Sequence, residues 1–248
     1  MKYYGSSDVG LLRKINQDSF AIVENTKHEL LAVVCDGIGG GPAGEVAAQM
    51  AVDHLRSCFL KQKDFKDDQE VNRWLKQTIQ EANDLIFMQS ANSLEQKGMG
   101  TTCVGVLKTV QDTYIFNVGD SRVYGVYASA FICLSEDHSL VCDLLKAGEI
   151  SEEEAKHHPQ RNMLTNALGI WNTVRIDINK IRSDYQKLLI CSDGLHGYVE
   201  EKDILQVLSS HVDITTQVTH LIDLSKLAGG YDNVSVILLC KEVEDAHE

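Results

Sequence analysis

Proline, long hydrophobic runs and positive charge are all scarce in this sequence of 248 residues. Its 2 prolines, Pro42 and Pro159, and the lack of any stretch rich in Pro, Gly and Ser leave nothing to mark a domain boundary, so we expect one domain over residues 1–248. No uninterrupted apolar run reaches the roughly 18 residues that a membrane span needs, and the first residues hold no apolar signal segment. We therefore expect a cytoplasmic protein that does not engage a membrane.

The shortage of positive charge excludes another class of partner. Lys and Arg number 23 against 36 Asp and Glu, which gives a formal net charge of −13. This charge would repel nucleic acid, so we expect no nucleic-acid partner. Carboxylates that converge on bound cations would relieve part of the self-repulsion, but a solvated acidic surface gives the same total. Composition leaves both interpretations open.

The cysteines form no recognisable pairing pattern. There are 7 of them, an odd number, with no CxxC pair and mostly apolar neighbours. We expect them to be reduced residues of the core. Cys35 and Cys191 stand close in sequence to aspartates discussed below, but buried strand cysteines of this kind are expected to be inert.

The apolar pattern predicts strands that lie between helices. Two short apolar runs, at 29–35 and 187–191, predict buried strands, and an Asp-Gly pair follows each within two residues. Further strands are predicted at 19–23, 101–107, 113–118, 122–127, 174–178 and 234–239. Apolar residues at helical spacing predict helices within 46–59, 71–86, 203–209 and 218–224. Strands grouped between two helix pairs argue against strict βαβ alternation and predict an α+β fold, with antiparallel sheets packed together under helices.

Residues 139–170 depart from this pattern. A short helix is expected to end at Gly148, a C′ glycine, and the residues from Ser151 to Glu154 form a capping box that opens another helix. Because this stretch has few large apolar anchors, we expect a surface excursion that moves and acts as a lid.

Five aspartates stand at or near predicted strand ends, each beside a small or turn-forming residue. They are Asp18, Asp36, Asp120, Asp193 and Asp232. Any one of them alone has an ordinary structural explanation, because Asp-Gly and Asp-Asn pairs are common in turns. If the strands lie side by side, the carboxylates meet at one sheet edge, where they could not all stay ionised without cations between them. Oxygen ligands would select Mg²⁺ or Mn²⁺.

Other chemistries have less support in the sequence. His157 and His158 are adjacent instead of four residues apart, and His138 has no partner at zinc-motif spacing. No G-x-S-x-G elbow offers a serine nucleophile, and the glycine run at 37–41 has no downstream lysine to make a phosphate-binding loop of the Walker type. We expect these glycines to permit a tight turn.

Eight short motifs follow one another along the chain. They are Asp8-Val9-Gly10 with Arg13 and Asn16-Gln17-Asp18, Val34-Cys35-Asp36-Gly37-Ile38-Gly39-Gly40, Gly98-Met99-Gly100-Thr101-Thr102, Gly119-Asp120-Ser121-Arg122, Asp137-His138-Ser139, His158-Pro159-Gln160-Arg161-Asn162 through Ala167-Leu168-Gly169, Ser192-Asp193-Gly194-Leu195, and Asp232-Asn233-Val234-Ser235-Val236. In this order and spacing the sequence resembles the metal-dependent serine/threonine protein phosphatases of type 2C, the PPM family, and most closely its compact bacterial members. The resemblance covers about residues 5–240.

The resemblance implies a four-layer α-β-β-α sandwich with a metal site at one sheet edge. It implies that Asp36 bridges two Mg²⁺ or Mn²⁺ ions, that the Gly37 carbonyl contributes, and that Asp193 and Asp232 complete the first ion. Asp18 would act largely through bound water.

Two further residues acquire roles from the same resemblance. Asp120 would help Asp193 to hold a third, weaker ion. Arg13 matches the phosphate-binding arginine of the family, a position where a planar bidentate donor suits two phosphoryl oxygens better than lysine would. From the residue alone, a surface salt bridge is the other interpretation of Arg13.

The implied reaction is hydrolysis of phosphoserine and phosphothreonine in proteins, opposing a bacterial Ser/Thr kinase. Two ions sharing a water would lower its pKa for in-line attack on phosphorus. We expect a monomer. Two alternatives remain: a catalytically silent binding or regulatory module on the same fold, and a phosphatase of small phosphorylated molecules that uses the same site.

The sequence also departs from the family pattern. Ile38 stands where eukaryotic members have a histidine thought to act as the acid, so the proton for the leaving alkoxide would come from metal-bound water at the Asp120 site. Gln17 replaces a common glutamate, which would weaken the second ion. Asn166 and Gly197 also differ, but neither is an expected ligand. The stretch at about 143–167 corresponds to the flap subdomain of the family, and residues 146–165 are expected to move and to influence substrate choice.

Overall fold

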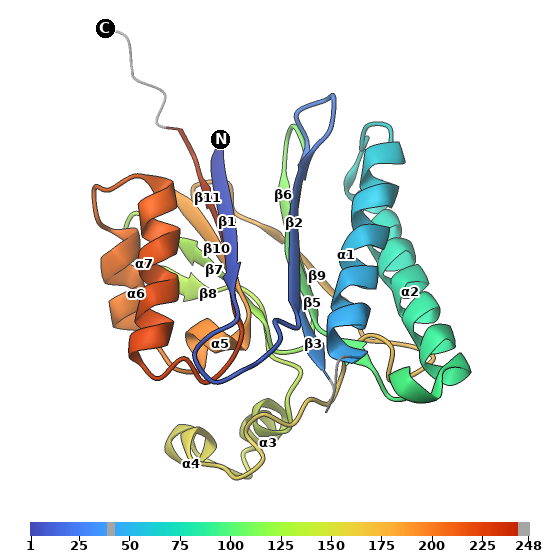
Figure 1. Ribbon diagram of the computed structural model, residues 1–248. Helices are drawn as coiled ribbons and strands as arrows, with labels where there is room; N and C mark the ends of the chain where they lie inside the picture. The colour runs from blue at the N-terminus through green and yellow to red at the C-terminus, as the bar shows by residue number, and fades with distance from the viewer. Residues whose placement is uncertain (39–42, 243–248) are drawn as a thin grey trace, which may run out of the picture.

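The computed structural model describes residues 1–38 and 43–242, and it shows two antiparallel sheets packed face to face between helices (Figure 1). The predicted α+β, four-layer sandwich is therefore confirmed. The turn expected for the glycine run at 37–41 falls mostly on residues 39–41, outside the described ranges. No helix in these ranges combines the length and the apolar character needed to cross a membrane.

Each sheet is a continuous antiparallel array. The first sheet has the order β1 (Lys2–Asp8), β11 (Val234–Cys240), β10 (Lys187–Cys191), β7 (Arg122–Val126) and β8 (Phe131–Cys133). The second has the order β2 (Asp18–Glu24), β3 (Leu30–Ile38), β5 (Cys103–Lys108), β6 (Thr113–Val118) and β9 (Asp177–Ile181), with the short β4 (Gly100–Thr101) paired to the end of β3. β1 and β2 are consecutive in sequence but lie in different sheets, so the chain crosses between the sheets at residues 9–17.

Helices cover the outer face of each sheet. The second sheet is covered by α1 (Ala43–Lys61) and α2 (Asp68–Asn92), and a short 3₁₀ turn, η1 (Leu94–Gln96), follows them. The first sheet is covered by α5 (Asp193–His196), α6 (Glu201–Leu208) and α7 (Ile214–Leu227). Three apolar layers result, two of them between a sheet and its helices and one between the two sheets. Because the middle of each sheet is covered on both faces, strands such as β3, β10 and β11 are nearly continuous apolar runs.

The remaining two helices, α3 (Leu140–Ala147) and α4 (Glu152–Lys156), project from one end of the sandwich (Figure 1). We call residues 139–165 the α3–α4 segment. Its predicted signals are confirmed: Gly148 ends α3 with φ 70°, and Ser151 and Glu154 form a reciprocal capping box. A bridge between Ser139 and Leu164 closes the segment at its base.

Two strand predictions were displaced by local hydrogen bonds. A strand was expected at 174–178, but β9 begins at Asp177. The reason is that the Asn166 side chain donates a hydrogen bond to the Arg175 carbonyl and accepts one from the Arg175 N–H, so neither group is free to pair with a strand. The run at 101–107 is split at Thr102, whose backbone N–H donates to the carbonyl of Asp36. β1 and β8 were not predicted, since β1 is largely polar and β8 has only 3 residues.

Candidate metal centre and active site

Asp18 and Asp36 face each other across β2 and β3, where the strand register makes them direct partners. Like charges in such a position destabilise a sheet. Asp18 is buried; Ser192 Oγ donates to its Oδ2 at 2.7 Å, while Oδ1 has no hydrogen-bond partner among the described residues. Burial, opposed by hydrogen bonds from Ser192 and Ser235 and reinforced by nearby carboxylates, raises the pKa of Asp18 to about 7. A buried acceptor oxygen without a donor is a place where a cation or its water would fit.

Asp36 is fixed at the end of β3 by the residues that split the next strand. Its backbone N–H donates to Thr102 Oγ1 at 2.9 Å, and its carbonyl accepts from Thr101 Oγ1 at 2.9 Å. Burial and the repulsion of Asp18 and Asp193 raise the pKa of Asp36 well above its ordinary range. This carboxyl is therefore rigidly placed and would be ionised most easily beside a positive ion.

Asp193 and Asp120 come from the other sheet. Asp193 opens α5 directly after β10, and burial and Asp232 raise its pKa to about 6. Asp120 lies between β6 and β7, and burial and Asp193 raise its pKa well above the ordinary value. His196 Nε2 donates to the Asp120 carbonyl at 3.0 Å, and burial keeps the pKa of His196 well below 6.5, so this imidazole is neutral near pH 7.

Arg13 and Asp232 form an ion pair at the mouth of the site. Arg13 Nη2 lies 2.8 Å from Asp232 Oδ2, and half of the arginine side chain, 50%, stays exposed. The pairing places Arg13 beside Asp232 in the lining of one cavity. Because one face of the guanidinium remains open, it could also bind a phosphoryl group.

The loop that carries Arg13 is anchored by Asn233, a residue for which no role was predicted. Its side-chain amide donates to the carbonyls of Val9 at 2.9 Å and Ile15 at 3.0 Å, and its Oδ1 accepts from the Gln17 backbone at 2.8 Å. These three bonds fix both ends of the crossover between the sheets. Only the folded chain reveals this, since the partners are more than 200 residues apart in sequence.

Gly37 is required by a close approach of two backbones. A Cβ at this position would lie 2.3 Å from the carbonyl oxygen of Gly44 at the start of α1. The Gly37 N–H donates to the Gln17 carbonyl at 3.1 Å. The glycine thus lets β3, α1 and the crossover loop meet at the edge of the site.

These residues surround one cavity of about 490 Å³, which we call the carboxylate cavity. Its lining includes every predicted site residue except the buried Asp18, that is Arg13, Asp36, Gly37, Asp120, Asp193 and Asp232, together with Gln17 and Ile38. Ile38 brings no titratable group to it. Thr102, Asn162, Ile170 and Trp171 also line the cavity, although none of them was predicted as a site residue.

The donor set fits hard divalent cations. It consists of carboxylate and carbonyl oxygens, with one buried oxygen left without a partner and several carboxyls that resist ionisation in each other's presence. In the described ranges no three of these carboxylates bring an oxygen within 4.8 Å of one another. The carboxylates are therefore spread around the cavity.

Known protein families include one that matches most of this chain. Residues 13–227 match the family model of protein phosphatase 2C. The chain belongs to the protein phosphatase 2C family. It is 36% identical over 238 residues to the serine/threonine phosphatase stp of Listeria monocytogenes, covering 96% of this chain and 94% of that one. It is 32% identical to the protein phosphatase PhpP of Streptococcus pneumoniae, covering 97% of both chains.

The solved structures agree with the sequence relatives. The serine/threonine phosphatase Stp1 from Staphylococcus aureus superimposes with a TM-score of 0.93 at 35% identity, covering 98% of this chain and 95% of that one. The chain is accordingly a protein serine/threonine phosphatase, and its family is metal-dependent, generally using Mn²⁺ or Mg²⁺. Phosphoproteins are therefore its substrates. The predicted family, activity and fold are confirmed.

A second cavity, of about 560 Å³, separates the body of the phosphatase from the α3–α4 segment. It shares Asp120, Asn162 and Asp193 with the carboxylate cavity, and Lys156 and Arg161 add positive charge to its wall. Its inner wall also holds a two-point ion pair of Arg122 with Asp137, at 2.9 and 2.7 Å.

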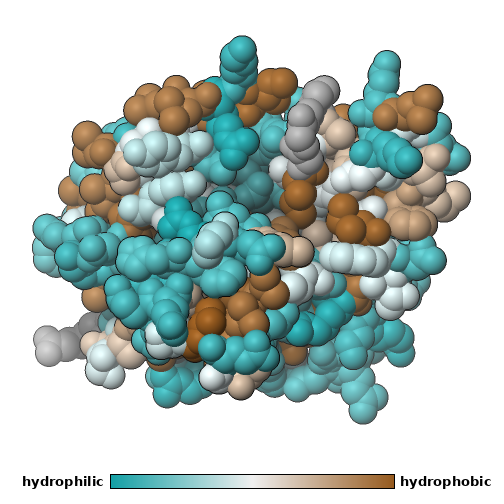
Figure 2. All heavy atoms as spheres, turned by 90° about the horizontal axis from the view of Figure 1, so that it is seen from below, coloured by the Kyte–Doolittle hydropathy of each residue, from teal (hydrophilic) through white to brown (hydrophobic). Residues whose placement is uncertain are grey.

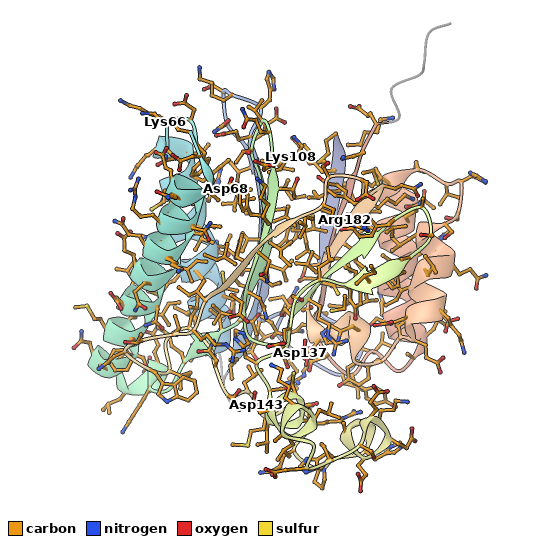
Figure 3. The ribbon with its side chains drawn as sticks, turned by 180° about the vertical axis from the view of Figure 1, so that it is seen from behind. Lys66, Asp68, Lys108, Asp137, Asp143 and Arg182 are labelled. Carbon is orange, nitrogen blue, oxygen red and sulfur yellow. The ribbon has the colours of Figure 1, made fainter. Side chains whose placement is uncertain are left out.

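One residue of the wall of this second cavity, Asp137, is labelled in the view from behind. Figure 3 shows Asp137 beside the helix that carries Asp143, while Lys66, Asp68 and Lys108 lie at the other end. The end face is a patchwork of hydrophilic side chains with apolar areas between them (Figure 2).

The departures from the family pattern fall into two groups. Gln17 and Ile38 line the carboxylate cavity, and Gly197 lines the second cavity. Asn166 instead lies in the interior, where its amide donates to His138 Nδ1 at 2.7 Å and to the Arg175 carbonyl at 2.8 Å. Asn166 is a structural residue that holds the end of the α3–α4 segment to the body.

Proposed function

We propose that the phosphatase hydrolyses phosphoserine and phosphothreonine by direct attack of water on phosphorus, without a phosphorylated enzyme. Asp36, the Gly37 carbonyl, Asp193 and Asp232 would hold two Mn²⁺ or Mg²⁺ ions, and Asp18 would act through water. The observation that carries this proposal is the convergence of strand-end carboxylates from both sheets on one cavity, backed by the unpaired buried oxygen of Asp18. When bound, the ions supply a water of lowered pKa and neutralise charge on the phosphoryl oxygens.

Arg13 is the positively charged side chain that would bind the phosphoryl group of the substrate. Its guanidinium lines the cavity on a loop fixed by Asn233, and half of its side chain stays exposed beside the pair with Asp232. It would bind two equatorial phosphoryl oxygens and hold the phosphorus in line for attack. Its charge would also stabilise the transition state, because the excess negative charge there is spread over those oxygens.

The proton for the leaving alkoxide needs a different source from that of histidine-containing relatives. Ile38 has no proton to give, and His196 already donates its Nε2 proton to the Asp120 carbonyl. Asp120, together with Asp193, would hold a third, weaker ion and the water that protonates the serine or threonine oxygen. Full turnover in Asp120→Ala would contradict this assignment.

The cellular role follows from the substrates that such a site accepts. We propose that the phosphatase is a cytoplasmic monomer whose single domain spans residues 1–248 and that it opposes a bacterial Ser/Thr kinase, acting on the kinase or on its targets. Nucleic acid and membranes are not among its partners in this proposal. The flap subdomain at about 143–167 would close over the phosphorylated segment and select it through the second cavity.

The proposal is tested by hydrolysis of a phosphothreonine peptide and of p-nitrophenyl phosphate, titrated with Mn²⁺ and Mg²⁺ against a chelator. Turnover should require the metal and should be lost in Asp193→Asn and Asp232→Asn, but not in Asp223→Asn, which changes an exposed aspartate on α7. Equal turnover in chelator would overturn the metal site. Hydrolysis of p-nitrophenyl phosphate without any phosphopeptide turnover would instead favour a small-molecule substrate.

A further inference from the structure

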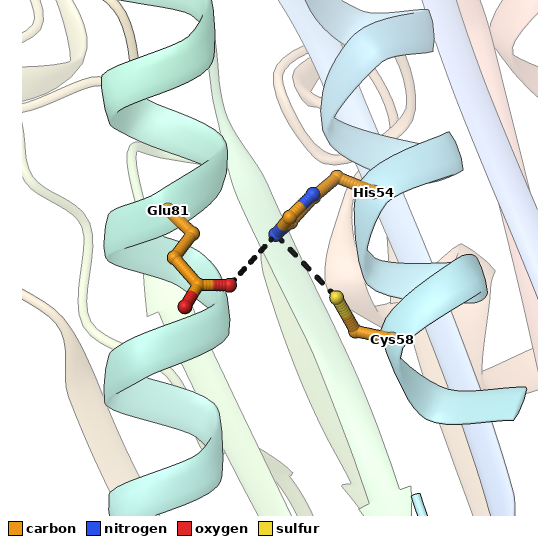
Figure 4. A group of neighbouring side chains, drawn as sticks. All are labelled: His54, Cys58 and Glu81. Atoms are coloured by element: carbon orange, nitrogen blue, oxygen red, sulfur yellow. Dashed lines mark hydrogen bonds and ion pairs between the residues drawn. The ribbon is translucent and has the colours of Figure 1, made fainter. Parts of the chain in front are cut away.

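A second group of metal-ligating side chains lies on the outer helices, away from the carboxylate cavity. His54 and Cys58 are one turn apart on α1, and Glu81 faces them from α2 (Figure 4). Within the described ranges, these residues form the group of three His, Cys, Asp or Glu side chains whose ligand atoms all lie within 4.8 Å of one another. None of them lines the carboxylate cavity.

The distances within this group match those around a tetrahedral ion. His54 Nε2 lies 3.3 Å from Glu81 Oε2 and 3.5 Å from Cys58 Sγ. A zinc ion with Zn–N and Zn–O bonds of about 2.0 Å and a Zn–S bond of about 2.3 Å would separate these atom pairs by about 3.3 and about 3.5 Å. Two of the three atom pairs are therefore already spaced for one ion, and the third pair, Cys58 Sγ and Glu81 Oε2, lies within 4.8 Å.

Hydrogen bonds to His54 Nε2 account only poorly for the way these three side chains converge. Glu81 and Cys58 both approach the same imidazole nitrogen, Nε2 of His54. A single Nε2–H can serve both partners only as a bifurcated bond shared between the carboxylate and the thiol sulfur, which is a weak acceptor, so each bond is weakened. A thiol–imidazole–carboxylate relay would use opposite ring nitrogens. A single cation at the point where the three atoms converge satisfies all of them at once.

The surroundings support a site open to solvent on one side. Gln77 Nε2 donates to Glu81 Oε1 at 2.8 Å, which leaves Oε2 directed at His54. Such a partner behind a metal ligand is typical of metal sites. The side chains of His54 and Glu81 are 18% and 44% exposed, so water can reach a fourth coordination position.

We propose that His54 Nε2, Cys58 Sγ and Glu81 Oε2 bind a zinc ion, with water as the fourth ligand, at a site independent of the active centre. Binding forms a Zn–S bond and releases the thiol proton to solvent, with no change of oxidation state. A thiolate and an imidazole favour zinc over Mg²⁺ or Mn²⁺, whereas the oxygen ligands of the carboxylate cavity favour the reverse. The ion would link α1 to α2 on the outer face of the second sheet.

The test uses metal-free, full-length protein and Co²⁺ as a spectroscopic substitute for zinc. One equivalent of Co²⁺ should give a thiolate-to-cobalt charge-transfer band, which added Zn²⁺ should abolish. The band should persist in Asp232→Asn, because the carboxylate cavity has no thiol in its lining. It should disappear in Cys58→Ser and persist in Cys240→Ser, a matched change at a half-buried cysteine on β11.

A second measurement covers the affinity and the fold. Zn²⁺ titrated against a competing chromophoric chelator should bind about 10-fold more weakly to Gln77→Ala than to the unaltered protein, and more weakly still to His54→Ala. Circular dichroism of each metal-free variant establishes that it is folded. The proposal is overturned if folded Cys58→Ser keeps the charge-transfer band, or if the unaltered protein shows none. Mn²⁺-dependent turnover of Cys58→Ser should be unchanged, so failure here leaves the active-site proposal standing.

Discussion

The carboxylate cavity and the α3–α4 segment meet at the same end of the phosphatase but are built in opposite ways. The cavity's aspartates stand at strand ends, with buried Ser192, Thr102 and Asn233 hydrogen-bonded behind them. Helices α3 and α4 bury none of their own residues. We infer that the chemistry lies on the rigid part of the molecule, and that the α3–α4 segment can vary and move at small cost to stability.

The largest effect is expected at the centre of the rigid region. Asp36→Asn keeps the side chain's shape but removes the charge shared between the two proposed ions, so kcat should fall by at least about 10²-fold. The measurement is steady-state hydrolysis of a phosphothreonine peptide in saturating Mn²⁺. Asp223→Asn serves as the control on an exposed helix position. A variant with more than a tenth of normal turnover would show that the cavity's central carboxylate is dispensable.

The next effect concerns the mouth of the cavity. Arg13→Ala removes a charge-assisted bidentate contact of about 1.5–3 kcal/mol, so kcat/KM should fall roughly 10- to 100-fold, and Arg13→Lys should recover only part of the loss. Both substrates should be affected alike, because the contact is to the phosphoryl group. If Arg13→Ala lost activity on the peptide alone, Arg13 would belong functionally with the α3–α4 segment.

The rigid region should also control how stability depends on pH when metal is absent. In the folded chain the pKa of Asp18 is about 7 and that of Asp193 about 6, against an ordinary 3.8. Between the ordinary pKa of 3.8 and these raised values, the folded state binds more protons than the unfolded state. The free energy of unfolding should therefore fall as pH rises from about 4 to about 7. Thermal unfolding in chelator measures this, and Mn²⁺ should reverse the loss.

Asp18→Asn provides the matched control for that pH dependence. The amide does not titrate, so the slope between pH 4 and 7 should become shallower, while the melting temperature near pH 7 should rise in chelator. An unchanged slope would mean that burial and the neighbouring carboxylates do not raise the pKa of Asp18 in the metal-free protein.

The smallest effect is expected on the α3–α4 segment, and it should be selective. Lys156→Glu places a negative charge in the wall of the second cavity, and KM for a phosphopeptide should rise about 3- to 5-fold through repulsion of the anionic substrate. Hydrolysis of p-nitrophenyl phosphate should not change. Lys27→Glu, in the exposed turn between β2 and β3, is the control. Equal effects on both substrates would remove the distinction between the two regions.

Much of the fold was predictable because local signals agreed with the final structure. Apolar runs marked the buried strands, and the capping box at Ser151 and the glycine at 148 marked the ends of α4 and α3. The displaced start of β9 was not predictable, since it depends on the Asn166 side chain bonding to Arg175, a contact that only tertiary packing creates.

The site divides in the same manner. The aspartates could be found from their strand-end positions, and Arg13 from the family resemblance. Their supports could not, because Ser192 reaches Asp18 across 174 positions of sequence. The spacing of His54 and Cys58 on one helix was visible in the sequence, but their third partner, Glu81, comes from a different helix.

The central claim is that the strand-end carboxylates hold the catalytic ions. The most direct test is a crystal structure of the phosphatase grown with Mn²⁺, with anomalous scattering used to locate the metal. The account predicts two strong peaks in the carboxylate cavity within bonding distance of Asp36, Asp193 and Asp232, and their loss in Asp36→Asn. If the protein used for the crystals had full Mn²⁺-dependent activity but the crystals showed no peak in that cavity, the carboxylates would not be the ligands of the catalytic ions.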